Sequence, residues 1–456
     1  MFNKVVVANR GAVAARVLRA LKSLGIRTAA VYSEADADLP YLNLADETYA
    51  IGAADPRASY LNADALLEVM ARSKADGLHP GYGFLSENAE FAQRVNDSGA
   101  NFIGPSPRWI SAMGHKTRAR ELMATQGMPM STSSDLLDED EQRTLAQALR
   151  VGYPVLVKPA GGGGGIGMLP AHDAQSLLQA VSQARSMAQR SFGSSELYLE
   201  RLIERPRHVE FQVLADRHGN VRHLFERDCS VQRRHQKVLE EAGAPGIPRE
   251  SITQVADTIS AILAKLGYDV IGTVEMLYDG QGGFNFLEMN TRLQVEHAVT
   301  EEVTGIDLVK SQVRLAWGER LDAVLPERIE INGHAIEARI YAEDPVRFFP
   351  SPGPLKAFEL PSGEGLRVET GYAAGNRVTP NYDPMVAKVI AHGATRAQAI
   401  ARLQQALEAT VIEGVKTNIP FVQQMLRSEE FAAGDVHTGL GAQLLDRAKA
   451  AKAATV

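Results

Sequence analysis

The stretch that decides how this chain is built is residues 273–296, TVEMLYDGQGGFNFLEMNTRLQVE. A short apolar strand ends at the turn DGQGG (279–283), and a second extended segment follows, so the pattern predicts a β-hairpin. From 288 to 296 every even position is polar, whereas the odd positions are Met, Thr, Leu and Val. Because alternate side chains of a strand share a face, acids, amides and an arginine would project together.

The side chains on that face are suited to binding a metal and an anion. Glu275 would fold back roughly opposite Glu288, and together with Asn290 they offer hard oxygen ligands to a divalent cation. Arg292 suits a planar anion such as bicarbonate or a carboxylate, and Glu296 is placed to act as a general base. The alternative is the solvated outer face of an edge hairpin, which favours interchangeable Lys, Thr and Ser instead.

A run of glycines predicts a phosphate-binding loop. The strand VLVKPA (155–160) carries Lys158, and GGGGGIG (161–167) follows it. Consecutive glycines cost folding entropy, and such a loop is typical where backbone N–H groups must approach a phosphate closely. The alternative is a flexible linker, although linkers usually mix glycine with serine. The pattern differs from G-x-x-x-x-G-K-[ST], which argues against a Walker-type NTPase.

Three weaker features remain open from the residues alone. The segment RDCSVQRRHQK (227–237) is dense in donors, which indicates either a nearby anion or a basic surface loop. Within it, Cys229 is interpreted as a buried structural thiol. The segment HPGYGF (79–84) is either a ligand-binding strand end or a turn with a packed aromatic ring. Arg339, on a predicted strand between acids, has the pattern of an ion-paired arginine.

The order of the predicted elements indicates the fold class. Strand and helix alternate at Val5–Ala8, Val13–Leu24 and Thr28–Tyr32, which predicts a parallel α/β sheet. From Arg207 onward the strand patterns become denser and antiparallel, and helix returns near the C-terminus. The chain is therefore expected to be a multidomain protein that combines α/β and α+β parts.

Composition and charge exclude several classes of protein. Lys and Arg number 48 and Asp and Glu 55, a net charge of −7 over 456 residues, which argues against coating nucleic acid or an anionic membrane. The single cysteine allows no disulfide within the chain and suits a reducing compartment. We find no apolar run near the roughly 18 residues of a membrane span, and the N-terminus leads directly into a strand, so we expect a cytoplasmic protein.

Several motifs, in order, resemble those of biotin carboxylase, the ATP-grasp subunit or domain of biotin-dependent carboxylases. The resemblance extends from about residue 1 to 445 and rests on these segments: ANRG (8–11), HPGYGFLSE (79–87), Lys158 with 161–168, RHVE (207–210), ERDCSVQRRHQKV (226–238), EMNTRLQVEH (288–297) and EARIYAEDP (337–345). It implies an ATP-grasp fold with an N-terminal Rossmann-like parallel-sheet domain, a mobile glycine-rich lid and a C-terminal mixed α+β domain.

The resemblance also implies domain boundaries. They are an N-terminal α/β (pre-ATP-grasp) domain at 1–113, an ATP-grasp domain at 114–330 with its lid at about 131–204, a C-terminal domain at 331–446 and a frayed tail at 447–456. The implied reaction consumes ATP and bicarbonate, forms carboxyphosphate and ADP, and transfers the released CO₂ to biotin on a carrier protein.

The resemblance assigns the bicarbonate chemistry to five positions. Glu296 would deprotonate bicarbonate. Arg292 would hold that anion, together with Gln294 and the backbone of Val295. Lys237 would contact both the bicarbonate and the transferring phosphate.

The remaining roles concern biotin, metal and nucleotide. Arg339 would stabilise the biotin enolate, with Tyr82 close to the same ring. Glu275, Glu288 and Asn290 would hold two Mg²⁺ or Mn²⁺ ions. ATP would be bound by residues of several segments, with the backbone from 200 to 203 at the adenine edge: Lys116, Lys158, Gly164, Gly165, Glu200, Ile203, His208, Gln232, His235, Glu275 and Glu288.

Three positions depart from the family pattern, namely Ala12 in place of Glu, Ile166 in place of Arg or Lys, and Ala298 in place of Pro. Two other functions stay open: another ATP-grasp ligase that forms an acyl phosphate, and a catalytically weak regulatory paralogue. We find no Met-Lys-Met biotin-acceptor motif, so we expect the biotin carboxyl carrier protein and the carboxyltransferase to be separate chains. A homodimer is expected, without nucleic acid or membrane as partners.

Overall fold

The computed structural model describes residues 1–160, 167–234 and 236–454 of the chain. These residues divide into two compact units. The first unit comprises 1–114, 207–276 and 288–456, and the second comprises 115–206 and 277–287. Two strands, β12 and β13, continue from one unit into the other.

The N-terminal part of the first unit is a parallel sheet with strand order β3-β2-β1-β4-β5. Its strands and helices are β1 (Lys4–Val7), α1 (Gly11–Ser23), β2 (Arg27–Tyr32), η1 (Glu34–Asp36), η2 (Pro40–Leu44), β3 (Glu47–Ala50), η3 (Pro56–Ala58), α2 (Ala63–Ser73), β4 (Gly77–His79), α3 (Ala89–Asp97), β5 (Asn101–Phe102) and α4 (Pro107–Gly114). The run VVV of β1 is fully buried, as parallel strands covered on both faces require. The predicted alternation of strand and helix is confirmed.

The main sheet of the first unit joins segments that are far apart in the sequence. Its order is β13-β12-β9-β10-β11-β14-β19-β17. The strands are β9 (Arg207–Ala215), β10 (Val221–Arg233), β11 (Gln236–Ala242), β12 (Val270–Tyr278), β13 (Phe284–Asn290), β14 (His334–Tyr341), β17 (Leu366–Thr370) and β19 (Met385–Gly393). Short strands complete this part as the pairs β15 (Gly353–Pro354) with β18 (Arg377–Val378), and β16 (Ala357–Glu359) with β20 (Val411–Glu413).

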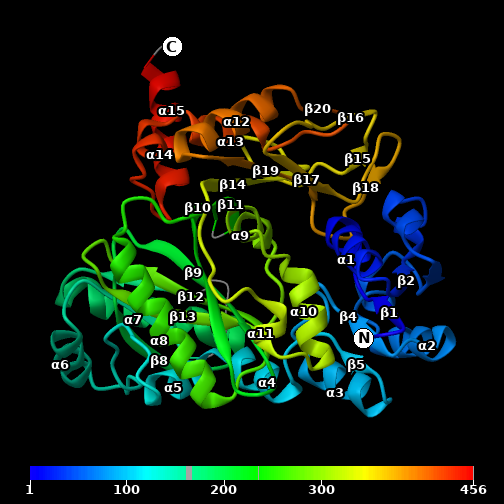
Figure 1. Cartoon of the computed structure of the whole chain (residues 1–456). Helices are drawn as coiled ribbons and strands as arrows, with labels where there is room; N and C mark the ends of the chain where they lie inside the picture. Colours follow the sequence, from blue (N-terminus) through cyan, green and yellow to red (C-terminus); the bar gives the residue numbers. More distant parts are fainter. Residues whose placement is uncertain (161–166, 235, 455–456) are drawn as a thin grey trace. The chain divides into compact units, whose positions relative to one another are not determined.

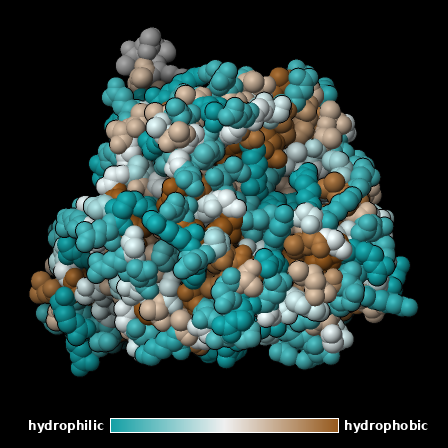
Figure 2. Space-filling model, viewed as in Figure 1, coloured by the Kyte–Doolittle hydropathy of each residue, from teal (hydrophilic) through white to brown (hydrophobic). Residues whose placement is uncertain are grey.

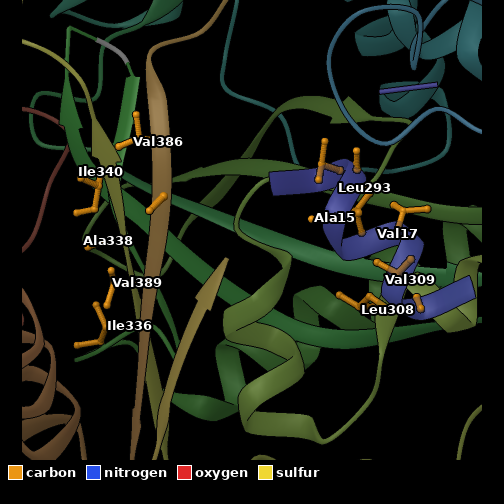
Figure 3. Close-up of a cluster of buried hydrophobic side chains, with 14 of the residues drawn as sticks. Ala15, Val17, Leu293, Leu308, Val309, Ile336, Ala338, Ile340, Val386 and Val389 are labelled. Carbon is orange, nitrogen blue, oxygen red and sulfur yellow. The ribbon is translucent and has the colours of Figure 1, made fainter. Parts of the chain in front are cut away.

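Helices lie between and after these strands along the chain. They are α8 (Arg249–Leu266), α9 (His297–Thr304), α10 (Leu308–Trp317), α11 (Leu321–Val324), α12 (Arg396–Glu408), α13 (Ile419–Leu426), α14 (Glu429–Ala433) and α15 (Leu440–Ala454). The helix α12 packs on β14 and β19 (Figure 1). Figure 3 shows the apolar side chains of those two strands, including Ile336, Ala338 and Val389.

The second unit is a small sheet with helices around it. The strand order is β7-β6-β8, with β6 (Val155–Pro159), β7 (Leu169–Ala171) and β8 (Leu197–Arg201), all paired antiparallel. Its helices are α5 (Lys116–Thr125), α6 (Glu141–Val151) and α7 (Ala174–Phe192). Side chains of Asp140 and Asp173 accept bonds from the first turns of α6 and α7 and so cap them. The predicted strand before the glycine run is β6, whereas residues 161–166 lie outside the described residues.

Two expectations from the sequence are wrong in detail. The alternation of polar residues predicts a second hairpin strand that runs to residue 296, but β13 ends at Asn290 and α9 begins at His297. Leu293 is fully buried and packs in a cluster with residues of α1 and α10 (Figure 3), so the segment turns inward. The alternative of a basic surface loop at 227–237 also fails, because β10 and β11 form a hairpin there and Arg227 is fully buried.

No helix among the described residues is both long enough and apolar enough to cross a membrane. On the face drawn in Figure 2, hydrophilic residues predominate and hydrophobic ones form scattered patches.

Candidate active site

The centre of the charged cluster in the first unit is the ammonium group of Lys237 on β11. Its Nζ lies 2.6 Å from Oε2 of Glu210, 2.9 Å from Oε1 of Glu275 and 2.7 Å from Oε1 of Glu296. The three carboxylates come from β9, from β12 and from the residue before α9, and all are buried. Lys237 thus attracts three acids that would otherwise repel one another, and Arg227 and Arg339 add positive charge at Glu210 and Glu296.

The electrostatics of this cluster keep Lys237 and Glu296 charged. Burial works to lower the pKa of Lys237, but Glu210, Glu275 and Glu296 outweigh it and hold that pKa well above its ordinary value. Burial works to raise the pKa of Glu296, but Lys237 and then Arg339 hold it well below its ordinary value. The pKa of Glu296 would rise if these cations turned to other anions.

Arg339 on β14 is the second cation that contacts Glu296. Its Nε donates to Oε1 of Glu240 at 2.5 Å, and its Nη2 donates to Oε2 of Glu296 at 3.0 Å. The two oxygens of Glu296 are thus held by different cations, Lys237 on one and Arg339 on the other. The predicted ion-paired arginine is confirmed, and its partners are acids on β11 and before α9.

Arg292 lies after the end of β13 and is held by several oxygens. Its Nε donates to Oε2 of Glu87 at 2.8 Å, its Nη1 to Oε1 of Gln294 at 3.0 Å and its Nη2 to Oδ1 of Asn290 at 3.0 Å. Burial works to lower the pKa of Arg292, but Glu87 above all raises it. The guanidinium is thus oriented beside the residues that the sequence associated with bicarbonate.

The metal donors predicted from the sequence are brought together in part. The amide of Asn290 donates to Oε1 of Glu275 at 2.9 Å, and Glu288 is half-buried on the same strand as Asn290. His208 and Glu210 offer further donors, because their ligand atoms lie within 4.8 Å of each other and of Glu275. Carboxylate, amide and imidazole donors in one buried group fit a divalent cation.

His208 joins this cluster to β10. The amide of Gln232 lies 3.1 Å from Nδ1 of His208 and also donates to the carbonyl of Cys229 at 3.0 Å. His235, which the resemblance assigns to the nucleotide with them, lies outside the described residues.

Cys229 is a buried free thiol, as predicted. Its Sγ lies 3.9 Å from Oε1 of Glu296. Burial, together with Glu210, raises the pKa of the thiol well above its ordinary value. A thiol in this state is a poor nucleophile, so Cys229 has a structural role.

The second unit contains its own charged group near the predicted phosphate loop. Nζ of Lys158 lies 2.6 Å from Oε2 of Glu200, and Ser131 Oγ donates to the other oxygen of that carboxylate. Burial works to raise the pKa of Glu200, but Lys158 and Arg120 lower it. Glu200 thus holds Lys158 at the end of the strand that precedes the glycine run.

Other predicted nucleotide residues have these positions. Lys116 is exposed at the start of α5, and Ile203 is half-buried just after β8. Gly164 and Gly165 lie outside the described residues.

Tyr82 follows β4 in a glycine-rich turn. Gly81 and Gly83 have φ angles of 64° and 70°, which an L side chain rarely adopts. The amide of Asn9 donates to the carbonyls of Pro80 at 2.7 Å and of Tyr82 at 2.8 Å. The turn is therefore fixed against the loop that follows β1, and the half-buried ring of Tyr82 takes a defined position.

Two of the departures from the family pattern lie at helix starts. Ala12 is half-buried in the first turn of α1, and Ala298 is fully buried in the first turn of α9. The first turn of a helix accommodates proline as well as alanine, so Ala298 needs no compensating change. Ile166 lies outside the described residues.

The sequence did not single out several charged residues of this site. Glu87 ends the motif HPGYGFLSE (79–87) and Glu210 ends the motif RHVE (207–210), so these motifs could have indicated both residues. Glu240 and Lys388 lie on β11 and β19, where no spacing of polar residues in the sequence indicates a site. They join the cluster only through the pairing of β11, β14 and β19.

The buried acids of the sheet predict a loss of stability as the pH rises. Burial raises the pKa of Glu240 to about 8, against the attraction of Arg339 and with the repulsion of Glu337. Burial likewise raises the pKa of Glu337 to about 7. A carboxyl whose pKa is higher in the folded than in the unfolded chain contributes its full stability only below the unfolded pKa. That stability is lost once the pH has risen through the pKa of the folded state. We expect Tm to fall by a few degrees between about pH 5.5 and 8.5.

Thermal unfolding of wild type and of Glu240→Gln at several pH values checks this expectation. Glutamine keeps the shape of a protonated carboxyl and cannot ionise, so the variant should show a shallower decline of Tm. Glu408→Gln, an exposed acid paired with Arg427, serves as the control and should follow wild type. An equally steep decline in Glu240→Gln would contradict the assignment.

Three family models match the chain. They are the biotin carboxylase N-terminal domain over residues 1–110, the carbamoyl-phosphate synthase L chain ATP binding domain over 115–324, and the biotin carboxylase C-terminal domain over 337–442.

A relative of nearly the same length is similar to the chain throughout. "Biotin carboxylase" of Halalkalibacterium halodurans is 50% identical over 441 residues, 96% of this chain and 97% of that protein.

Solved structures are similar as well. The biotin carboxylase domain dimer of Hydrogenobacter thermophilus 2-oxoglutarate carboxylase, in complex with MgADP, ADP and bicarbonate, matches with a TM-score of 0.88 and 42% identity, covering 96% of this chain and 97% of that chain. The biotin carboxylase subunit of pyruvate carboxylase matches with a TM-score of 0.87 and 43% identity, covering 98% of this chain and 99% of that chain.

Proposed function

We infer the roles of individual residues from one premise: this chain belongs to the biotin carboxylase family. The chain uses ATP and bicarbonate to carboxylate biotin, the first half-reaction of a biotin-dependent carboxylase. One observation supports the residue roles above the others. Glu296 is fully buried with Lys237 on one carboxylate oxygen and Arg339 on the other, which supports a role as proton acceptor beside two cations that could each turn to an anionic substrate.

In the first step, bicarbonate would lie against Arg292, the amide of Gln294 and the backbone of Val295. Glu296 would take the proton of bicarbonate. The deprotonated oxygen would then attack the γ-phosphorus of ATP, so that ADP leaves and carboxyphosphate forms. As Lys237 turns to the bicarbonate and the transferring phosphate, Glu296 loses a partner that lowered its pKa. Its basicity therefore rises when the substrates are in place.

Different residues would bind the phosphates, the adenine and the metal ions of the nucleotide. Lys116, Lys158, Gly164 and Gly165 would contact phosphates, and the chain from Glu200 to Ile203 would line the adenine. His208, Gln232 and His235 would contact the nucleotide as well. Glu275, Glu288 and Asn290 would hold Mg²⁺ or Mn²⁺, which would neutralise phosphate charge during transfer.

In the second step, carboxyphosphate would release CO₂ for capture by biotin. The phosphate left behind would take the proton of the ureido nitrogen of biotin, so that the ureido oxygen gains negative charge and the nitrogen attacks CO₂. Arg339 would stabilise that charge with its guanidinium, and Tyr82 would lie against the same ring. In the structure Arg339 contacts Glu240 and Glu296, and these acids would hold its guanidinium in place for this step.

The partners are proposed on the same premise. A similar chain of nearly this length is described as one subunit of a pyruvate carboxylase, which supports a carrier protein and a carboxyltransferase on other chains. A similar domain is described as a dimer, which supports a homodimer. We also propose a cytoplasmic location, where ATP is available.

The test is ADP release by the purified chain with Mg²⁺, in four mixtures with and without bicarbonate and free biotin. Release that needs bicarbonate and rises with biotin is the expected result. ATP turnover without a biotin response would favour another ATP-grasp ligase that forms an acyl phosphate. Tight ATP binding without turnover would favour a regulatory paralogue, with Ala12 and Ile166 as the first positions to revert.

A further inference from the structure

Lys388 on β19 is a fully buried lysine that no step above uses. Its Nζ lies 2.9 Å from Oε2 of Glu369 and 3.2 Å from Oε2 of Glu337. It also donates a hydrogen bond to the backbone carbonyl of Val295. Burying an ammonium group is costly unless every proton has a partner, and Lys388 has a partner for each of its three.

The register of the sheet explains why these groups meet. Lys388 lies opposite Arg339 of β14 on one side and opposite Glu369 of β17 on the other. Directly opposite residues of antiparallel strands point to the same face, and Glu337 is two residues from Arg339 on that face. The helix α9, which begins one residue after Glu296, packs on β14 and β19. A charged face of the sheet therefore lies beneath the segment that leads into α9.

This segment carries the residues assigned to bicarbonate, and the contacts of Arg292 and Gln294 already hold part of it. It leaves β13 at Asn290 and enters α9 at His297. At its end, Nδ1 of His297 lies 2.7 Å from the carbonyl oxygen of Gln294. A carbonyl only accepts, so that ring nitrogen carries the proton. Lys388 binds the next carbonyl along, that of Val295, and thus fixes the peptide between Val295 and Glu296.

We propose that Lys388 is a positioning residue for bicarbonate activation: by holding the Val295 carbonyl it sets the orientation of the Val295–Glu296 peptide and of the base. The two acids account for the presence of a cation at this place, because they lie on β14 and β17, the strands on either side of β19, and a positive charge between them offsets their repulsion. They do not account for the third hydrogen bond, which Lys388 donates to the carbonyl of Val295. The proposal rests on the proposed function of Gln294, Val295 and Glu296.

The test compares Lys388→Met/Glu337→Gln with Val389→Ala and wild type. The double variant removes one positive and one negative group, so that Glu369 keeps Arg367 as its partner and no unpaired charge stays buried. Val389 is the next residue on β19, fully buried and with an apolar side chain that cannot hydrogen-bond the turn, so its truncation costs stability in the same strand. The single variant Lys388→Met is measured as well.

Bicarbonate-dependent ADP release gives kcat and the KM for bicarbonate, and a separate titration gives the Kd for ATP. For the double variant we expect kcat/KM for bicarbonate to fall about 100-fold, as a small misplacement of reacting groups can cost, while the Kd for ATP changes little. Val389→Ala should match it in lowered Tm but keep kcat/KM near wild type.

The outcomes separate this inference from the proposed function. If wild type shows no bicarbonate-dependent release, the proposed function fails first. If wild type is active and the double variant loses no more kcat/KM than Val389→Ala, Lys388 is a structural residue and the inference is overturned. If only Lys388→Met fails to fold, the double variant still decides the question.

Discussion

Replacing Glu296 by glutamine lowers bicarbonate-dependent ADP release about 100-fold or more and leaves ATP binding nearly unchanged. Glutamine keeps the size of the side chain, and its one carbonyl oxygen can accept a hydrogen bond from Lys237 or from Arg339, which donate to different oxygens of Glu296. It cannot take a proton from bicarbonate, so the attacking oxygen is not formed. Lys237 retains Glu210 and Glu275 as partners, and therefore the surrounding cluster stays neutralised.

The measurements are steady-state ADP release with saturating bicarbonate and a titration of ATP binding. Glu302→Gln is a matched control, because Glu302 lies on α9 and also pairs with an arginine, Arg367, but lies outside the Lys237 cluster. The control should keep normal turnover. Normal turnover in Glu296→Gln would contradict the role of Glu296 as base. Loss of ATP binding would indicate that the substitution has disrupted the whole site.

Arg339→Ala reduces biotin carboxylation about 100-fold but changes biotin-independent ATP cleavage by only a few-fold. The guanidinium is proposed to act on the ureido oxygen of biotin, which is absent from the first step. The substitution also leaves Glu240 buried without its partner. Since burial already raises the pKa of Glu240 to about 8, this acid becomes protonated more readily and the cost to folding is limited.

Two assays on the same preparation check this expectation: ADP release without biotin, and bicarbonate-dependent carboxylation of free biotin. Arg339→Ala/Glu240→Gln removes the unpaired acid and should behave like the single variant. Arg233→Ala serves as a comparison, because Arg233 is another buried arginine of this sheet, paired with Glu343. Equal losses in both assays for Arg339→Ala would place the residue in the first step rather than at biotin.

The sequence by itself predicted the chemistry of the site. The spacing of Glu275, Glu288 and Asn290 indicated a metal, and Arg292 and Glu296 indicated an anion beside a base. The alternation of strand and helix determined the N-terminal parallel sheet. The parallel sheet is confirmed, because it depends on local periodicity and turn residues, whereas the roles of the site residues stay predictions.

The tertiary structure decided which charges neutralise each other. The strand order β11-β14-β19-β17 brings Glu240, Arg339, Lys388 and Glu369 onto one face, although they lie up to about 150 residues apart. The burial of Leu293 ended β13 early and turned Glu296 into the cluster, against the prediction of a continuous strand. Burial and pairing between distant strands depend on the whole packed sheet, and no local pattern specifies them.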